Sequence, residues 1–299
     1  MTRHPSRHDR LWLVCKAAFD GWWNHNVPRM GAALAYYTLF ALAPVLIVVI
    51  AVGGAAFGTA AVRSEIVGQI QQLIGKDGAQ TVQAMLEAAG KSSPQLIVTI
   101  IGIVTFVLGA TGAFLELQSD LDAIWCVKPK NRGSVLRELL IQRLISIGLV
   151  LGFAFVLLTA LVLSAALAAI SSFVGTSFPG AAEFWTTADL AASLGVISLL
   201  FAMIYKVMPD VDLAWRDVWF GAVVTAVLFT IGKSVIGLYL GASVLTSTYG
   251  AAGSVIVILV WVYYSSQILL LGAAFTKAHV DEFRGTPKPS LGAIKTEES

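Results

Sequence analysis

The chain has 299 residues, of which 57% are hydrophobic and 13% are charged, and its formal net charge at neutral pH is +2. Ordinary soluble domains carry about 25% charged residues, so this chain has too few polar side chains to cover a soluble fold of its size. The small net charge gives no electrostatic reason to expect a nucleic-acid partner, and two cysteines and four histidines offer little material for disulfides or a metal cluster.

Residues 1–32 are predicted to form a cytoplasmic segment that contains a short amphipathic helix. The apolar residues that share one face of this helix are Leu11, Cys15, Ala18, Trp22 and Trp23. A tryptophan-bearing face beside basic residues is typical of a helix that lies in the lipid headgroup layer. We interpret the segment as a membrane-surface anchor.

The apolar stretches that follow are long enough to cross a membrane, which takes roughly 20 residues of helix. They are continuous and do not alternate with a period of two, so they predict helices and exclude a barrel. The predicted fold is all-α, a polytopic bundle of six transmembrane helices within residues 33–276. The expected spans are residues 33–57, 95–117, 141–170, 190–208, 218–240 and 253–275.

Residues 58–94, between the first two spans, form the sizeable extracytoplasmic part of the predicted topology. Apolar residues recur at helical spacing on both sides of Gly75-Lys76-Asp77-Gly78. We therefore expect two short amphipathic helices here. They are expected to cap the bundle, and a lid that handles substrate is the alternative.

Lysine and arginine in the flanks of the spans set the expected orientation. Most of them fall in the N-terminal segment, the second and fourth loops and the tail, whereas Arg63, Lys76 and Lys91 fall on the opposite side. Both termini are therefore expected in the cytoplasm, as are Cys15 and Cys126, where thiols stay reduced. Residues 277–299 are predicted to be a disordered cytoplasmic tail.

Lys233 is the main polar residue inside a predicted span, and ionisable side chains are costly in hydrocarbon. Its helix face carries small residues, which mark the side where membrane helices pack closely, so Lys233 is expected to point into the bundle. It is then either a structural lysine satisfied by carbonyls and hydroxyls or part of a substrate or ion site; snorkelling is a further alternative. The candidate intramembrane polar site comprises Lys233, Thr230, Gln267 and Tyr263. For Gln267 and Tyr263, ordinary helix packing is the alternative.

Other charged residues gather near the predicted cytoplasmic end of the second span. Glu116 is expected to lie too far along the membrane normal to pair with Lys233. We predict a cytoplasmic-rim network of Glu116, Asp120, Asp122 and Lys128. In the first span, Pro44 removes a backbone hydrogen bond and is predicted to kink the helix.

Several motifs along the chain form a recognisable set. They are AALAYYTLFALAP at residues 32–44, LDAIW at 121–125, WRDV at 215–218, GA at 221–222, YG at 249–250, WVY at 261–263 and LLGA at 270–273. The first is the most specific, and together they resemble the YihY/BrkB-like family of bacterial inner-membrane proteins. The resemblance covers about residues 30–276 and implies a multi-pass protein of the bacterial cytoplasmic membrane.

Two positions depart from the family pattern: Ala274 stands where the family usually has glutamate, and Asp122 where it tends to have asparagine. Any mechanism that rests on that glutamate does not carry over to this chain. Family members are often described as tRNA-processing ribonucleases, and some as virulence or serum-resistance factors.

The ribonuclease description can be compared with the residues present. A metal-dependent nuclease needs clustered histidine and carboxylate ligands, but the histidines here are scattered near the two ends of the chain. These are His4, His8, His25 and His279. The cytoplasmic positive charges are also spread over short segments and do not form a groove for tRNA. We therefore expect no enzymatic activity, no metal or other cofactor, and no nucleic-acid partner.

The leading hypothesis is a transporter, channel or lipid-handling protein of unknown substrate, in which Lys233 binds anionic lipid or a small anionic substrate. The alternative is a non-transporting membrane scaffold in envelope organisation or resistance, which would use residues 58–94 and the N-terminal segment as contact surfaces. A tRNA-processing ribonuclease has the least support. The lipid bilayer is the expected partner, and the sequence leaves a homo-oligomer open.

Overall fold

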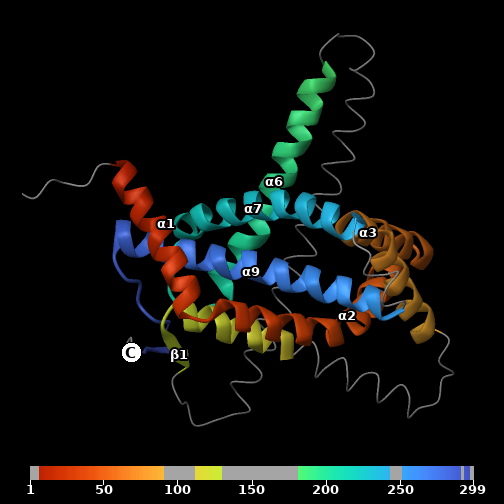
Figure 1. Ribbon diagram of the computed structural model, residues 1–299, viewed down its shortest axis with the longest axis horizontal. Coiled ribbons are helices and arrows are strands. Elements are labelled where there is room, and N and C mark those ends of the chain that lie inside the picture. Colours follow the sequence, from red (N-terminus) through yellow and green to blue (C-terminus); the bar gives the residue numbers. More distant parts are fainter. Residues whose placement is uncertain (1–6, 91–111, 130–180, 243–250, 291–292, 297–299) are drawn as a thin grey trace, which may run out of the picture. The chain divides into compact units, whose positions relative to one another are not determined.

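The structure is a computed structural model that describes residues 7–90, 112–129, 181–242, 251–290 and 293–296. Most of these residues are α-helical (Figure 1), which confirms the prediction of a helical protein. The chain divides into two compact units. Unit 1 is Met1–His25, Ser119–Leu228 and Leu269–Ser299, and unit 2 is Asn26–Gln118 and Phe229–Ile268.

Unit 2 contains a hairpin of α2 (Val27–Phe57) and α3 (Thr59–Gly90), joined by the single residue Gly58. The φ angle of Gly58 is 86°, in the left-handed region that favours glycine. Its backbone N–H donates to the Gly54 carbonyl at 2.9 Å, which closes the end of α2. Because Gly54 has no side chain, Thr59 packs directly against it.

α3 is one continuous helix, whereas the sequence predicted two short ones. The helix runs through Gly75-Lys76-Asp77-Gly78 without a break. Each internal glycine costs about 1 kcal/mol relative to alanine, but a break would create two further helix ends with unpaired backbone groups. Val82 and Leu86 beyond the glycines are buried, and their packing favours the uninterrupted helix.

The core of unit 2 is an apolar cluster drawn from α3, α7 (Trp215–Ala242) and α9 (Ala251–Arg284). Its buried members are Val82, Leu86, Ile236, Val257, Ile258 and Trp261. Phe229 of α7 meets Trp261 of α9 edge to face, with ring centroids 6.0 Å apart. Apolar residues of α2, among them Leu39 and Leu42, cover the cluster.

Unit 1 contains α1 (Arg7–Asn24) and α6 (Ala181–Val207), together with parts of α7 and α9. Residues 119–124 complete a helical stretch that begins at residue 112 and lead into strand β1 (Val127–Pro129). β1 pairs antiparallel with β2 (Ala293–Lys295), with Lys128 opposite Ile294.

This strand pairing corrects the prediction of a disordered tail. α9 continues to Arg284, and Gly285, with a φ angle of 80°, follows its end. The Asp212 backbone N–H then donates to the Lys288 carbonyl, and the Ser290 N–H donates to the Asp210 carbonyl, both at 3.0 Å. The prolines of the tail suggested disorder. Main-chain hydrogen bonds of this kind depend little on side-chain type, so the sequence did not predict them.

α1 lies within the predicted N-terminal segment, and its exposed face includes Cys15 and Trp23 of the predicted face but not Ala18. Ala18, placed by the sequence analysis on the membrane face, is buried together with Val14. The exposed aromatic residues are Trp12, Phe19 and Trp23, which lie on one stripe at spacings of seven and four residues. Packing of Val14 and Ala18 inside unit 1 fixes this rotation, and the position of the helix in a headgroup layer stays a prediction.

In the part of the chain that the structure describes, three helical windows are long and apolar enough to cross a membrane. They are Leu190–Val207 in α6, Trp215–Ile236 in α7 and Val255–Arg284 in α9. These windows overlap the last three predicted spans, which supports a membrane protein.

The first predicted span, residues 33–57, falls within α2. α2 continues past Pro44 to Phe57, and a kink at Pro44 stays a prediction. Of the second predicted span, residues 112–117 are described and are helical. The third, residues 141–170, lies outside the described residues.

Candidate functional site

Lys233 lies on α7 and is partly buried. It directly follows Gly232, which lies against the ring and hydroxyl of Tyr264 on α9. This contact places the segments of α7 and α9 that carry Lys233 and Tyr263 next to each other, and a shared polar site of the two side chains stays a prediction. Within the described residues, the Lys233 ammonium takes part in no hydrogen bond or ion pair.

The other members of the candidate polar site face different neighbours. The Gln267 amide Nε2 donates to the Val27 carbonyl at 3.2 Å, at the start of α2. The same amide lies against Gly31, where any side chain would collide with it. Gln267 thus packs α9 against α2, which agrees with the packing alternative.

Thr230 lies about one helical turn before Lys233 on α7, and Tyr263 lies on α9. The Thr230 carbonyl accepts a hydrogen bond from the Ser234 hydroxyl at 3.4 Å, and Tyr263 is exposed. In the part of the chain that is described, neither side chain is hydrogen-bonded to Lys233. The candidate polar site of Lys233, Thr230, Gln267 and Tyr263 therefore stays a prediction.

A buried polar contact in unit 1 joins α6, α7 and α9. The Tyr205 hydroxyl lies 2.8 Å from the Thr225 hydroxyl and donates to the Leu269 carbonyl at 2.7 Å. Gly272 of α9 faces Thr225 and Tyr205 directly, and an added Cβ there would overlap both hydroxyls. The glycine lets the helices approach closely enough for the hydroxyls to reach their partners, so this cluster holds three helices together.

At the predicted cytoplasmic rim, Asp122 is buried and its Oδ1 accepts a hydrogen bond from the Asp210 backbone N–H at 2.7 Å. Burial raises the pKa of Asp122 from 3.8 to about 7, the Asp210 N–H acts in the opposite direction, and the nearby Asp210 charge raises it further. The carboxyl of Asp122 therefore titrates near neutral pH.

The other predicted members of the rim network have different surroundings. Asp120 is buried, Glu116 is partly buried, and Lys128 is exposed on β1. Among the residues described, Lys128 forms no ion pair with Asp122. Asp122 therefore binds the main chain before α7, and the wider rim network stays a prediction.

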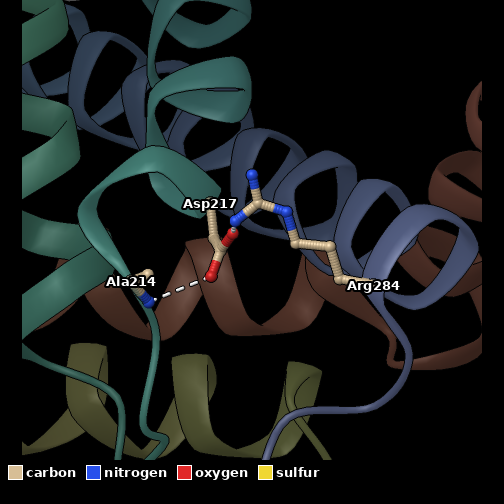
Figure 2. A network of polar contacts seen from close by, with 3 residues as sticks. All are labelled: Ala214, Asp217 and Arg284. Carbon is tan, nitrogen blue, oxygen red and sulfur yellow. Dashed lines mark hydrogen bonds and ion pairs between the residues drawn. The ribbon is translucent and has the colours of Figure 1, made fainter.

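An ion pair between Asp217 on α7 and Arg284 on α9 was not predicted from the sequence. Figure 2 shows the Asp217 carboxylate between the Ala214 backbone and the Arg284 guanidinium. Asp217 Oδ2 accepts a hydrogen bond from the Ala214 N–H at 3.0 Å, which caps the start of α7. Arg284 lies in the last turn of α9, where positive charge complements the helix dipole. The acidic residue in the first turn of α7 was the sequence signal for this cap.

The family model described as virulence factor BrkB matches residues 18–292. The chain belongs to this family. The likeness is not confined to one motif, because the match covers nearly the whole chain, including the end of α1, the three apolar windows and the β1 strand.

Curated relatives in this family are named UPF0761 membrane proteins. One from Ralstonia nicotianae is 28% identical over 83% of this chain and 54% of the relative. One from Pseudomonas paraeruginosa is 28% identical over 90% of this chain and 65% of the relative. One from Pseudomonas aeruginosa is 29% identical over 83% of this chain and 58% of the relative. The chain thus spans less than two thirds of the length of these relatives. No solved structure matches it.

Two motifs that carry the resemblance to the BrkB family now have structural roles. Asp217 of WRDV caps α7 and pairs with Arg284. Gly272 of LLGA lies where α9 meets Thr225 and Tyr205. Both motifs therefore position the membrane helices, and neither contains Lys233.

Proposed function

We propose that this chain is a multi-pass protein of the bacterial cytoplasmic membrane that handles a substrate bearing an anionic group, as a transporter, channel or lipid-handling protein. The observation that carries the proposal is Lys233. Its ammonium belongs to a helix apolar enough to cross a membrane, is partly buried, and has no ion-pair partner in the described part of the chain.

An uncompensated charge is costly in hydrocarbon, and an anionic headgroup or solute offsets that cost. Lys233 also follows Gly232, where α7 and α9 approach closely. The backbone of Lys233 is therefore next to a point where two helices pack together. These features favour a lysine held near a helix contact over one directed freely into lipid.

The proposal includes six transmembrane helices with both termini in the cytoplasm, supported by the distribution of lysine and arginine among the loops. It assigns no catalytic chemistry to the chain, because the four histidines are scattered in the sequence. A ribonuclease would need clustered ligands or a general-base pair.

The test uses the purified full-length protein in a neutral detergent. Its melting temperature is measured with dioctanoyl phosphatidylglycerol, which is anionic, with dioctanoyl phosphatidylcholine, which is zwitterionic, and with inorganic phosphate. A ligand that binds the folded state raises the melting temperature. We expect the anionic lipid or phosphate to raise it more than phosphatidylcholine, and comparison of the two distinguishes a lipid headgroup from a free anion.

Lys233→Met is expected to abolish the difference between anionic and zwitterionic lipid. Lys206→Met is the matched control, because Lys206 is also partly buried in a helix apolar enough to cross a membrane. The control should keep the difference. An unchanged anionic shift in Lys233→Met would refute the proposal.

The alternative is a membrane scaffold, supported by the exposed aromatic stripe of Trp12, Phe19 and Trp23 on α1. The two functions differ in what they require of Lys233. Loss of cellular function in Lys233→Ala at unchanged abundance is expected for a transporter or lipid-handling protein and is not expected for a scaffold. Replacement of the three aromatic residues by serine should instead impair a scaffold more.

A further inference from the structure

Cys126 lies at the turn between the helical stretch 112–124 and β1, in unit 1. Two titratable side chains reach its sulfur from two other elements. His25 comes from the residues that follow α1, and Lys277 comes from α9. All three residues belong to unit 1, whereas Lys233 belongs to unit 2, and no part of the proposed function uses this cluster.

The hydrogen bonds of His25 define the chemical role of its ring. Nδ1 lies 2.7 Å from the Gly21 carbonyl oxygen, which accepts hydrogen bonds and cannot donate them. Nδ1 therefore carries a hydrogen. In the neutral ring, Nε2 then holds a lone pair, and it lies 3.8 Å from Cys126 Sγ. Nε2 is placed to accept the thiol proton.

Lys277 supplies positive charge on the same sulfur. Its Nζ donates a hydrogen bond to Cys126 Sγ at 3.2 Å. An ammonium in this position favours negative charge on sulfur, and thiolate is the nucleophilic form of cysteine. The sulfur is also 3.9 Å from the Ile124 carbonyl oxygen. If Cys126 stays a neutral thiol, this oxygen can accept its S–H hydrogen bond.

The backbone holds Cys126 in place for this contact. Its φ angle is 54°, in the left-handed region that residues other than glycine rarely adopt. The Cys126 N–H donates to the Ala123 carbonyl at 3.1 Å, and the Cys126 carbonyl accepts from the Thr296 N–H at 2.8 Å. The tail residue Thr296 thus helps to fix the turn that presents the sulfur to His25 and Lys277.

We propose that Cys126 is a reactive thiol that hydrogen peroxide oxidises to a sulfenic acid, with His25 as the proton acceptor and donor and Lys277 as the stabilising charge. His25 Nε2 takes the thiol proton, and the thiolate attacks one peroxide oxygen. The S–O bond forms as the O–O bond breaks, and the proton on His25 passes to the departing hydroxide. The sulfur loses two electrons, the peroxide gains them, and the products are Cys–SOH and water.

A small, neutral peroxide suits this site because Cys126 is only partly exposed. Cys15 provides an internal reference, since it is exposed on α1 in the same chain. Exposure alone therefore predicts faster reaction at Cys15, whereas the proposal predicts faster reaction at Cys126.

The experiment uses two single-cysteine forms of the full-length protein in detergent, Cys15→Ser and Cys126→Ser. Each is treated with hydrogen peroxide at pH 7 in the presence of dimedone, which traps sulfenic acid, and the adduct is followed by intact mass. Because Lys277 and His25 both contact the Cys126 sulfur, whereas Cys15 is exposed on α1, we expect Cys126 to react about tenfold faster than Cys15.

Three further variants in the Cys15→Ser background assign the roles. Lys277→Met and His25→Ala should slow the reaction to the rate of Cys15, while Lys277→Arg should retain most of it. Reaction of Cys126 at or below the rate of Cys15 would overturn the proposal, as would an unchanged rate in Lys277→Met. If Lys277→Met fails to fold, the comparison of the two cysteines in otherwise unaltered chains still decides the matter.

Discussion

In unit 1, several buried polar side chains contact partners from neighbouring elements, whereas unit 2 is built on an apolar cluster and Lys233 has no partner among the described residues. In unit 1, Asp217 binds the Ala214 main chain and Arg284, and Asp122 binds the Asp210 main chain. Buried side-chain atoms without a hydrogen bond occur in the described parts of both units, among them Arg63 Nη2 and Gln267 Oε1 in unit 2 and His279 Nδ1 in unit 1.

This difference separates structural polar groups from the candidate functional one. A polar side chain that closes a helix end or joins two helices has its hydrogen-bonding capacity used by the fold. A lysine in an apolar helix without such partners is available to a ligand. If the polar contacts of unit 1 are structural, substitutions that remove or crowd them should lower the stability of the fold.

The largest effect is expected where α7 and α9 cross in unit 1. A side chain at Gly272 would overlap the hydroxyls of Thr225 and Tyr205, so Gly272→Leu should separate the helices. Overpacking by a few methylenes already costs about 1–3 kcal/mol, and we expect loss of most folded protein. The measurement is the yield of monodisperse protein on gel filtration.

Gly195→Leu in α6 is the matched control, because nothing lies within 4 Å of a Cβ added there. It should leave the yield unchanged. Equal yields for the two variants would show that the crossing is not required.

The second effect concerns the pH dependence conferred by Asp122, whose pKa rises from 3.8 to about 7 through burial. Its folded form binds more protons than its unfolded form between these values, so its contribution to the free energy of unfolding falls as pH rises through that window. The amide that replaces the carboxyl in Asp122→Asn does not titrate. The gain in stability of Asp122→Asn over the unaltered chain should therefore grow by about 3 kcal/mol between pH 5 and pH 8.

This prediction is measured by chemical denaturation of both forms across that pH range. A difference that stays constant with pH would mean that Asp122 is ionised throughout. Such a result would show that burial in unit 1 does not raise the pKa of Asp122.

A smaller loss in the free energy of unfolding is expected from Asp217→Ala. It removes the cap on the Ala214 N–H and leaves Arg284 without its carboxylate, which should cost about 2 kcal/mol. Arg284→Ala should cost less, because Asp217 keeps its bond to the main chain and the Arg284 side chain is 35% exposed. Melting temperatures compare the two, and the reverse order would contradict the capping role.

The smallest effect is expected from deletion of residues 291–299, which removes β2. The main-chain groups of β1 would then bind water, so the free energy of unfolding should fall by less than about 1 kcal/mol. Thermal denaturation measures the change. A loss larger than that of Asp217→Ala would make the tail strand a principal support of unit 1.

The sequence predicted the helices of this protein better than their polar contacts. Continuous apolar runs located α2, α6, α7 and α9, because the length and composition of a membrane helix are properties of one segment. The glycines of α3 suggested a break because glycine has a low helix propensity. Propensity does not include the tertiary packing of Val82 and Leu86, which favours the continuous helix. Proline content likewise suggested a disordered tail.

The polar contacts depend on which distant segments meet. The contact of Gln267 with Val27 joins residues 240 positions apart. The contact of Cys126 with Lys277 joins residues 151 positions apart. Single-sequence patterns carry no signal for such pairs, whereas Asp217 caps its own helix and was accessible from spacing alone.

The central claim, that Lys233 is available to a ligand, is tested most directly by labelling at its position. Cys15 and Cys126 are replaced by serine, Lys233→Cys is introduced, and intact cells are treated with a membrane-impermeant thiol reagent. Lys76→Cys and Lys130→Cys serve as controls for the outer and inner sides predicted from the charge distribution. Labelling at position 233 from either side, in cells or in inverted vesicles, is the predicted result; silence from both sides, with both controls labelling as predicted, would contradict the claim.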